Sequence, residues 1–323
     1  MLATAVGNYP KISNRPGGQK LRRAINRFDR GEVGTEELAQ VEDEVTREVI
    51  REQEQAGLDV ATDGMIRWDD GQTYLARQIE GFKITGLIRY FDTNTYYRQP
   101  VAAEPLRWKG PMTVRDYRFA TGCTSLPIKP ILTGPYTLAK LSHTEHHTGL
   151  LEFALDIAEV IRQEAKALEE AGATMLQLDE PAIVRNKEDW DLFQQVMSHL
   201  TEGLSIKRLL YTYFGDATDL PAFFQLPFHG FGLDFIWGPA NFDLLPHLPS
   251  DRELGLGIVD ARNVKLETVD HLSSTIERAM RHVSPDRIYL NPSCGLDYLP
   301  RETAFAKLRR MVEGMNAVKE AVG

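Results

Sequence analysis

Short apolar runs rich in β-branched and aromatic residues recur along the chain, and longer stretches with helical spacing of apolar positions separate them. Continuous apolar runs of this kind are typical of parallel strands that helices cover on both faces. The pattern predicts eight strands: Leu2–Val6, Leu58–Thr62, Lys129–Thr133, Thr174–Leu178, Arg208–Tyr213, Phe231–Ile236, Leu254–Val259 and Arg287–Leu290.

Amphipathic helices are predicted between these strands, from about Thr35 to Ala56 and over Thr303–Ala321. A third, which ends near Gly172, has one apolar stripe made of Leu151, Leu155, Ala158, Ile161, Ala165 and Leu168. Eight strands that each lead to a helix favour an α/β fold, the (β/α)8 TIM barrel, over an open doubly wound sheet. The commonest form of that alternative needs a G-x-G-x-x-G turn after an early strand, and the chain has none there.

Residues 64–128, between the second and third predicted strands, are too many for a single helix and predict an insertion. Within it, Gly86–Phe91 and Thr95–Arg98 flank the turn sequence Asp92-Thr93-Asn94, so we expect a hairpin. Long insertions at the mouth of a barrel usually cover or shape the site. No repeat or Pro/Gly-rich linker divides the chain, which predicts a single barrel domain over residues 1–323.

Charge and cysteine content exclude several classes of protein. A formal net charge of −9 argues against a general nucleic-acid binder. Two cysteines, Cys123 and Cys294, cannot build a disulfide framework. The sequence also has no signal-peptide pattern and no apolar run of about 18 residues. We therefore expect a soluble, cytoplasmic protein with neither a nucleic-acid nor a membrane partner.

Polar residues follow most of the predicted strands, where the active site of a (β/α)8 barrel lies. They are Asn8 in Gly7-Asn8-Tyr9-Pro10, Asp63, Asp179-Glu180-Pro181, Tyr213, Asp260 and Cys294 in Asn291–Gly295, beside Gly134-Pro135 and Trp237-Gly238. Carboxylates there can hold an ammonium group or transfer protons, and they can equally cap the following helices. Both interpretations stay open for Asp63 and Asp260, whereas the two adjacent acids of Asp179-Glu180 exceed what a cap needs.

The metal-binding residues that the sequence offers are few. Zinc takes about four nitrogen or sulfur donors, or three with one open position, and Cys294 is the only thiol in a strand-end loop. His143 and His146 have a spacing that could place two imidazoles on one helix face. A solvated surface cluster is the alternative for these histidines. The residues by themselves make a weak case for a metal.

A basic cluster follows the first predicted strand and surrounds Pro16-Gly17-Gly18. Its members are Lys11, Arg15, Lys20, Arg22 and Arg23. On an acidic chain such a cluster suits an anionic ligand tail, and a solvated helix start is the alternative. The aromatic residues Tyr90, Phe91, Tyr96 and Tyr97 likewise suit either core packing or a ring-stacking surface.

These motifs resemble the cobalamin-independent methionine synthase family, whose enzymes join two face-to-face barrels. Gly7–Ile12 with Asn14, Arg15 and Lys20 is similar to the opening loop of the family's N-terminal barrel. Other stretches similar to that barrel are Arg89–Asn94, Tyr211–Asp216 and Gly257–Asn263, while Leu132–Thr137 and Gln177–Ala182 occur in both barrels. The resemblance implies methyl transfer from a 5-methyltetrahydrofolate-like donor to the thiol of homocysteine.

The resemblance and the strand-end positions together lead to a set of expected site residues. We expect catalytic roles for Asp179 and Asp260. Substrate-binding roles are expected for Asn8, Arg15, Lys20, Asp63, Arg67, Glu180 and Tyr213, with Arg15 and Lys20 at the folate polyglutamate tail.

The chain departs from the family's C-terminal barrel, which binds zinc, homocysteine and the methyl-folate. Of that barrel's zinc ligands only Cys294 is present, in Asn291–Leu296, because Tyr211–Tyr213 and Trp237 or Gly238 occupy the other positions. Arg262 aligns near its proton-donating His and Met65 aligns with its homocysteine-binding Glu. Arg does not readily release a proton and Met cannot bind an ammonium group. Zinc is therefore possible only with an incomplete ligand set.

Three hypotheses follow. The first is a methyltransferase that works with a separately encoded catalytic barrel, which would hold most or all of the zinc. The second is a self-sufficient family member that acts on another thiol or one-carbon carrier, and the third is a barrel that binds folate or a partner without catalysis. The methyl donor, folate or methylcobalamin, and the oligomeric state stay open.

Overall fold

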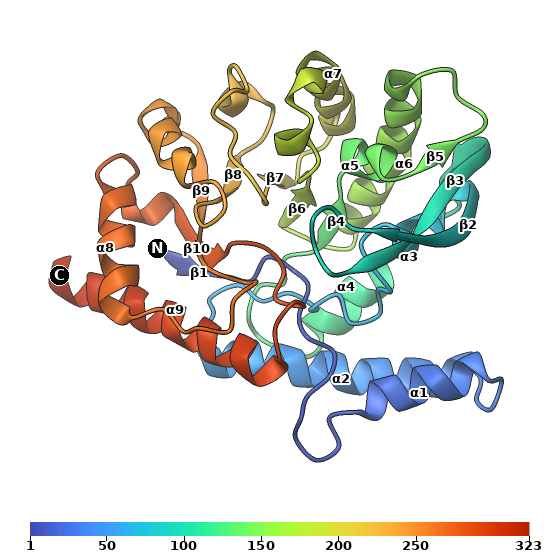
Figure 1. Ribbon diagram of the computed structural model, residues 1–323, viewed down its shortest axis with the longest axis horizontal. Coiled ribbons are helices and arrows are strands. Elements are labelled where there is room, and N and C mark those ends of the chain that lie inside the picture. Colours follow the sequence, from blue (N-terminus) through green and yellow to red (C-terminus); the bar gives the residue numbers. More distant parts are fainter. Residues whose placement is uncertain (323) are drawn as a thin grey trace. The chain divides into compact units, whose positions relative to one another are not determined.

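The computed structural model describes residues 1–322 and has an α/β fold with a sheet of seven strands. The strand order is β1-β10-β9-β8-β7-β6-β4, and the pairs β1–β10, β9–β10, β4–β6 and β6–β7 are parallel (Figure 1). The strands are β1 Leu2–Ala3, β4 Ile131–Thr133, β6 Met175–Asp179, β7 Lys207–Tyr211, β8 Gly230–Asp234, β9 Glu253–Val259 and β10 Ile288–Pro292. Seven of the eight predicted strands are thus confirmed.

The second predicted strand, Leu58–Thr62, is wrong as a strand and is reduced to two isolated bridges. Val60 pairs in parallel with Thr4, and Ala61 pairs in parallel with Ile128. The segment is short because Gly57 and Gly64, with φ of 87° and 71°, bound it in the left-handed region. Left-handed residues end an extended segment, so only a few backbone groups remain to pair.

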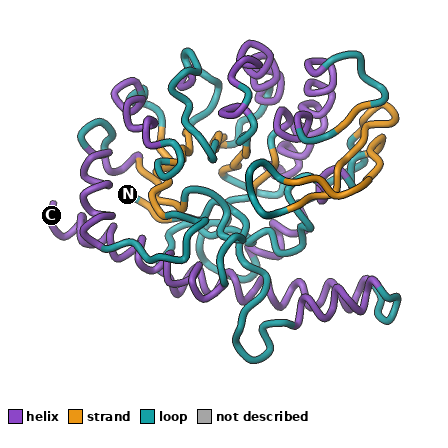
Figure 2. Tube along the Cα trace, in the orientation of Figure 1, coloured by secondary structure: helices purple, strands orange, loops and turns teal. Residues whose placement is uncertain are grey.

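The chain divides into two compact units, and the division falls within β8. Unit 1 consists of Met1–Arg67, Asp116–Lys129 and the residues from Gly232 onward. Its helices are α1 Lys20–Asp29, α2 Thr35–Ala56, most of α4 Val114–Thr121, η4 Pro239–His247, α8 Val269–Met280, η5 Pro285–Arg287 and α9 Arg301–Val322. The tube of Figure 2 shows α1 lying along α2, and α9 packs on both α2 and α8.

The ends of the helices in unit 1 follow ordinary capping rules. The backbone N–H of Gly57, in the left-handed conformation, bonds to carbonyl groups of the last turn of α2, and Glu36 and Glu37 lie in its first turn. The Thr268 hydroxyl accepts a hydrogen bond from the His271 N–H and caps α8. Both helices that were predicted in this unit are confirmed, at Thr35–Ala56 and within Arg301–Val322.

Unit 2 consists of Trp68–Arg115 and Pro130–Phe231. Its helices are α3 Thr73–Ala76, α5 Pro135–Lys140, α6 Leu150–Glu170, η1 Ile183–Arg185, η2 Lys187–Asp189, α7 Trp190–Thr201 and η3 Phe223–Gln225. The predicted hairpin is confirmed and is longer than expected, because β2 Glu80–Arg89 pairs antiparallel with β3 Tyr96–Arg107.

A short strand, β5 His143–Thr144, joins the edge of this hairpin, and His143 pairs with Val101. The hypothesis that His143 and His146 share a helix face is therefore wrong, since β-bridge pairing overrides the helical spacing. The neighbouring His147 bonds through its two ring nitrogens to the Thr144 hydroxyl and the Asp156 carboxylate, each at 2.8 Å. These contacts stabilise the turn between β5 and α6.

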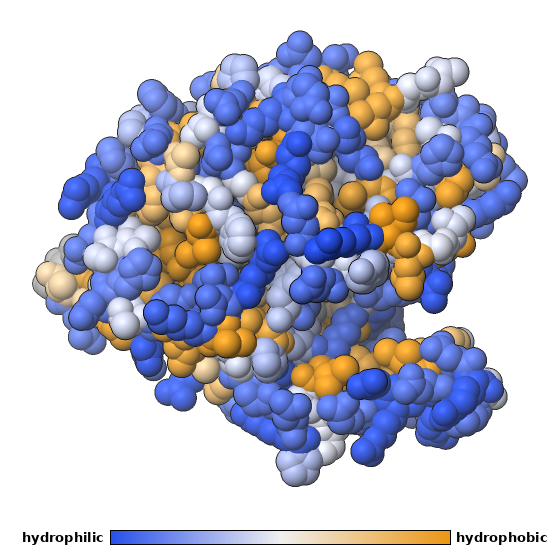
Figure 3. Space-filling view, in the orientation of Figure 1, coloured by the Kyte–Doolittle hydropathy of each residue, from blue (hydrophilic) through white to orange (hydrophobic). Residues whose placement is uncertain are grey.

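Hydrophilic residues dominate the face that Figure 3 shows, and hydrophobic residues appear on it in scattered groups. Among the described residues, no helix is both long enough and apolar enough to cross a membrane. Four residues of the predicted apolar stripe of α6 are fully buried, namely Ala158, Ile161, Ala165 and Leu168. Leu151 and Leu155, at the start of the helix, are only half-buried.

One buried carboxylate on α6 organises the chain that follows the hairpin in unit 2. Glu164 is fully buried, and its Oε2 accepts hydrogen bonds from Trp108 Nε1 at 3.0 Å and Met112 N at 2.8 Å. Its Oε1 accepts from the backbone N–H and the hydroxyl of Thr113, at 2.7 and 2.8 Å. Four donors compensate the lost hydration of this carboxylate.

Replacing Glu164 with Gln should destabilise the protein, because the new amide points a donor at groups that already donate. We expect a loss of about 2 kcal/mol or more in the free energy of unfolding, measured by urea denaturation. Glu170→Gln is the matched control, since Glu170 lies exposed on the same helix. Equal stability of the Glu164→Gln variant and the unchanged protein would contradict this account of the loop.

Candidate functional site

Two of the expected site residues meet at the ends of β6 and β7 in unit 2. Asp179 ends β6, is 8% exposed, and its Oδ1 accepts a hydrogen bond from Gln177 Nε2 at 2.7 Å. Its Oδ2 accepts from the Tyr213 hydroxyl at 3.3 Å. Asp179 and Tyr213 therefore form one polar group at the strand ends, as their sequence positions predicted. Such a pair can hold a cationic group or pass a proton between carboxylate and phenol.

The neighbouring Glu180 has a different place in the structure. It is fully buried, and its two oxygens accept hydrogen bonds from Tyr136 N at 3.0 Å and Thr137 N at 2.7 Å, in the first turn of α5. Burial raises the pKa of Glu180 to about 8 against the opposing effect of these donors, so the group is mostly protonated at neutral pH. A Cβ at Gly134 would lie 2.2 Å from Glu180 Oε1. The carboxyl group thus fills the space beside Gly134 and caps α5.

In unit 1, Arg67 forms ion pairs on the side of α2 and α4. Its side chain is 5% exposed, it pairs with Asp43 of α2, and its Nε lies 3.4 Å from Asp116 Oδ1 of α4. The guanidinium also lies over the ring of Phe119, with 5.0 Å between Cζ and the ring centre. These contacts occupy the group that was expected to bind substrate.

Asp63 lies next to this cluster, and its Oδ1 accepts a hydrogen bond from Met65 N at 3.0 Å. Asp63 keeps some solvent access, but the surrounding protein desolvates its carboxyl group. This desolvation, together with the nearby Asp116, raises the pKa of Asp63 to about 6. Met65 is buried in the left-handed region with φ of 51°. Asp63 is therefore a group that takes up a proton just below neutral pH.

Asp260 follows β9 and belongs to a loop that a buried ion pair supports. Its Oδ1 accepts a hydrogen bond from Arg262 N, and its own N–H donates to Glu267 Oε1, both at 2.9 Å. Lys307 of α9 is fully buried, and its Nζ lies 2.8 Å from Glu267 Oε1 and 2.7 Å from the Lys265 carbonyl oxygen. Asp260 lines a hollow of about 400 Å³ with Glu267 and others of the loop.

Cys294 follows β10 and is 1% exposed. Burial, followed by the negative charges of Asp234 and Asp297, raises the pKa of its thiol well above the ordinary value. Its loop packs on Asn8: the Leu296 N–H donates to the Asn8 carbonyl at 2.8 Å, and a Cβ at Gly295 would lie 2.9 Å from Asn8 Cβ. Asn8 and Cys294 are thus brought together, as predicted.

The donor atoms around Cys294 do not fit zinc. Within residues 1–322, no group of three or more His, Cys, Asp or Glu side chains could hold a metal ion. In the metal-free chain, burial and the charges of Asp234 and Asp297 raise the pKa of the Cys294 thiol. Among the described residues, Cys294 therefore has no set of companion ligands.

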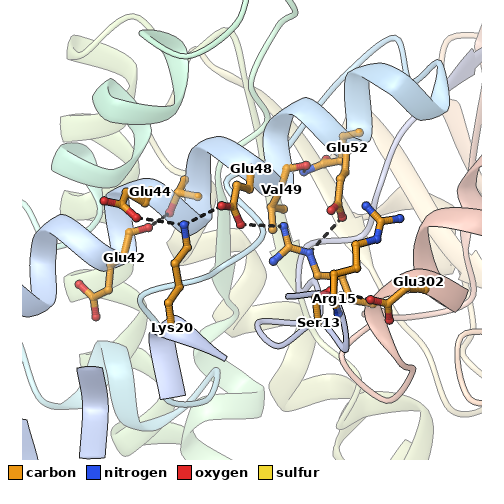
Figure 4. Close-up of polar contacts among 12 residues, drawn as sticks. Ser13, Arg15, Lys20, Glu42, Glu44, Glu48, Val49, Glu52 and Glu302 are labelled. Carbon is orange, nitrogen blue, oxygen red and sulfur yellow. Dashed lines mark hydrogen bonds and ion pairs between the residues drawn. The ribbon is translucent and has the colours of Figure 1, made fainter. Parts of the chain in front are cut away.

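Two members of the basic cluster after β1, Lys20 and Arg15, have different surroundings (Figure 4). Lys20 Nζ lies 3.0 Å from Glu44 Oε2 and 2.6 Å from Glu48 Oε1, both on α2. Burial alone would lower the pKa of Lys20, but these two carboxylates raise it. The Arg15 side chain is exposed, and its positive charge helps to lower the pKa of Glu302.

The loop that carries Arg15 is fixed to α9. The Ser13 hydroxyl and the Asn14 N–H both donate to Glu302 Oε1, at 2.5 and 3.1 Å. Arg301, whose side chain is 4% exposed, pairs with Glu52 at 3.1 Å and Glu48 at 3.5 Å. Between this loop, α2 and α9 lies a hollow of about 340 Å³ whose wall includes Arg15.

Sequence reasoning missed the supporting residues. Arg301, Glu302 and Lys307 neutralise charge or hold loops from helix α9, and Glu267 does so from the loop between β9 and α8. For the three residues of α9 the only signal in the sequence is a charged residue at a helical position, which is also the signal of an ordinary solvated surface. Glu267 stands several residues beyond the end of its strand, where a charged loop residue carries no signal of its own.

Known proteins similar to the chain agree on one family. Residues 70–284 match the family model "Cobalamin-independent synthase, N-terminal domain". A protein named methionine synthase from Saccharolobus solfataricus is 33% identical over 98% of this chain and 94% of its own length. The chain belongs to the cobalamin-independent methionine synthase family. A protein of the same name from Sulfurisphaera tokodaii is 32% identical over 98% of the chain and 92% of its own length.

Solved structures of this family share the fold. A B12-independent methionine synthase from a Shewanella species, in complex with selenomethionine, superposes with a TM-score of 0.84. The superposition covers 100% of this chain and 99% of that chain, at 21% identity. At this identity the likeness concerns the fold alone.

The raised pKa of Cys294 predicts slow reaction of its thiol, because alkylating reagents attack the thiolate. In a Cys123→Ser variant, which leaves only the buried Cys294, iodoacetamide should react more slowly than in Cys294→Ser. Burial raises the pKa of both thiols, but Cys123 is the more exposed one. The rate should keep rising through mildly alkaline pH without levelling off, since deprotonation is still incomplete there. Both variants should react alike once unfolded by urea. Fast labelling of native Cys294 near neutral pH would contradict the assignment of a protonated thiol.

Proposed function

We propose that the chain transfers a methyl group from a folate-type donor to homocysteine together with a separately encoded catalytic barrel that holds the zinc. Membership of the cobalamin-independent methionine synthase family makes the chain a methyltransferase of the methionine synthase type. One observation supports placing the zinc in a second barrel: Cys294 has no companion ligands among the described residues, and burial raises the pKa of its thiol. Zinc in the partner would supply the homocysteine thiolate at neutral pH.

Within this proposal the chain's own residues bind and orient the substrates. Asp179 with Tyr213, and separately Asp260, are the groups we propose for proton transfer or for binding an ammonium group. Asn8 and Asp63 complete the proposed substrate contacts from unit 1. The contacts of Arg67 and Glu180 support positioning roles, since Arg67 connects α2 and α4 and Glu180 caps α5.

We also propose that the strands close into a (β/α)8 barrel forming one domain, with residues 64–128 as its insertion. The two isolated bridges support closure, because they connect Thr4 to Val60 and Ala61 to Ile128, just ahead of β4. The bridged segment around Val60 would then stand in the position that an eighth strand has in other barrels. The two cysteines are unpaired, which supports the proposed cytoplasmic location.

Methionine formation from homocysteine and 5-methyltetrahydropteroyltriglutamate tests this function. We expect little product from the chain alone and clear product when a zinc-loaded catalytic barrel of the same family is added. The Asp179→Asn variant should lower that rate at least about 10-fold, as general acid–base groups contribute at least this much. Asp191→Asn, in α7, is the control for the charge change. An unchanged rate with Asp179→Asn would remove Asp179 from the proposed chemistry.

Self-sufficient catalysis is the second candidate, and one observation favours it. The chain covers 94% of the length of the Saccharolobus solfataricus protein named methionine synthase, so that protein is also of single-barrel length. Rapid methionine formation by the purified chain, without a second barrel, would select this candidate and contradict the proposed partner.

The polyglutamate tail of the donor is the ligand we propose for the hollow beside Arg15. Arg15→Ala should weaken binding of a triglutamate folate about 10-fold at low salt, because a charge-assisted hydrogen bond is lost. It should hardly affect the monoglutamate form, and the loss should shrink as salt screens the charges. Lys20 acts indirectly by neutralising Glu44 and Glu48.

Arg23→Ala is the matched control, since Arg23 is an exposed residue of the same basic cluster. Isothermal titration of both folates against the three proteins measures the effect. Equal affinity of Arg15→Ala and the unchanged protein for the triglutamate folate would contradict the proposed tail site. It would favour the alternative, in which the basic cluster is only a solvated helix start.

A further inference from the structure

A cation and two aromatic rings from consecutive strand-end loops of unit 1 lie in contact. Trp237 follows β8, Arg262 follows β9 and Tyr298 follows β10. The guanidinium carbon of Arg262 lies 4.5 Å from the ring centre of Trp237 and 5.9 Å from that of Tyr298. Distances within about 6 Å are those of cation–π contacts. Arg262 thus contacts two aromatic rings.

The Trp237 side chain remains largely open to solvent despite this contact. It is 52% exposed, whereas Trp68 and Trp190 are 2% and 6% exposed. A single exposed aromatic residue is ordinary on a protein surface. What distinguishes Trp237 is the planar cation that holds its ring in place.

Buried polar groups fix the backbone under Trp237. The Asp234 carboxylate is fully buried and accepts hydrogen bonds from the N–H groups of Ile236 and Trp237, both at 2.9 Å. Asn241 Nδ2 donates to the Asp234 carbonyl oxygen at 2.8 Å. The turn that carries Trp237 is therefore rigid on both sides.

The loops that carry Arg262 and Tyr298 are held in the same manner. The buried pair Lys307–Glu267 supports the loop of Arg262 through Asp260. Leu296 and Leu299 bond to backbone carbonyls at 2.8 and 3.0 Å on either side of Asp297 and Tyr298. Three loops that are ordered before any ligand arrives lose little conformational entropy on binding.

A fixed, half-exposed indole backed by a guanidinium is a surface on which a planar ring can stack. We propose that Trp237, Arg262 and Tyr298, together the ring platform, bind a planar heteroaromatic ring, the pteridine ring of the methyl donor. The inference rests on the proposed function only in the choice of a pteridine as the ring. The proposal gives a role to Trp237 and Arg262, which stand after β8 and β9, where the described residues include no group of metal ligands.

Calorimetric titration with pterin-6-carboxylate, which has the ring without the glutamate tail, tests the ring platform. Trp237→Leu should weaken binding about 10-fold, within what one ring stack contributes to nucleic-acid binding. Trp237→Phe keeps a smaller ring face and should lose less than about 3-fold, by the same comparison. Val264→Ala is the matched control, because Val264 is a 62% exposed apolar residue of the Arg262 loop.

A second readout follows the indole itself. Acrylamide should quench the fluorescence of the unchanged protein, and bound pterin-6-carboxylate should protect it, since the other described tryptophans are less exposed. Affinity of Trp237→Leu equal to that of the unchanged protein would overturn the proposal. An equal loss in Val264→Ala, or no binding to the unchanged protein, would do the same.

Failure of the ring platform and failure of the proposed function give different results. In one outcome, Trp237→Leu abolishes ring binding, but the unchanged chain forms no methionine with a catalytic barrel. This result would support the ring platform and contradict the proposed function. In the other outcome, Trp237→Leu forms methionine with an unchanged KM for the methyl donor. This result would contradict the ring platform and support the proposed function.

Discussion

A charge that is taken out of water needs a partner, and this requirement shapes most strand-end loops of the chain. Lys307, fully buried, holds Glu267 and with it the loop of Asp260 and Arg262. The same rule places Arg301 against Glu48 and Glu52. Glu164 is satisfied by four donors. Glu180 has no such full compensation: it accepts two hydrogen bonds from the first turn of α5, and burial still raises its pKa to about 8. Many charged side chains near the candidate site are therefore structural, and only a few remain to meet a ligand.

This division has a chemical consequence for the family's reaction. Transfer of a methyl group to homocysteine needs the thiolate of homocysteine, which a zinc ion would supply when bound. Cys294, the strand-end thiol of this chain, belongs to no group of three or more metal-binding side chains among the described residues. The chain offers the pair of Asp179 and Tyr213, the exposed Arg15, and Trp237 in contact with Arg262. These groups suit binding and orientation of a substrate more than activation of its sulfur.

The sequence predicted the α/β fold because apolar runs report strands that are covered on both faces. It failed at Leu58–Thr62, where left-handed Gly57 and Gly64 leave only two bridges. It failed again at His143, because pairing with Val101 is a long-range contact that local spacing does not encode. Strand-end position correctly predicted that Asp179 lies beside Tyr213, and Asn8 beside the loop of Cys294. It could not tell that Arg67 is turned toward Asp43, since ion-pair partners come from distant helices.

The central claim is that the fold of this chain supplies no zinc site around Cys294. Competition of the purified chain with a chelator of known zinc affinity measures this directly, with Cys294→Ser as the comparison. The account predicts weak zinc binding that is the same in both proteins, because the thiol is protonated and has no companion ligands in the described residues. About one tightly held zinc ion per chain, lost in Cys294→Ser, would contradict this claim. It would indicate that this chain itself holds the zinc that activates homocysteine.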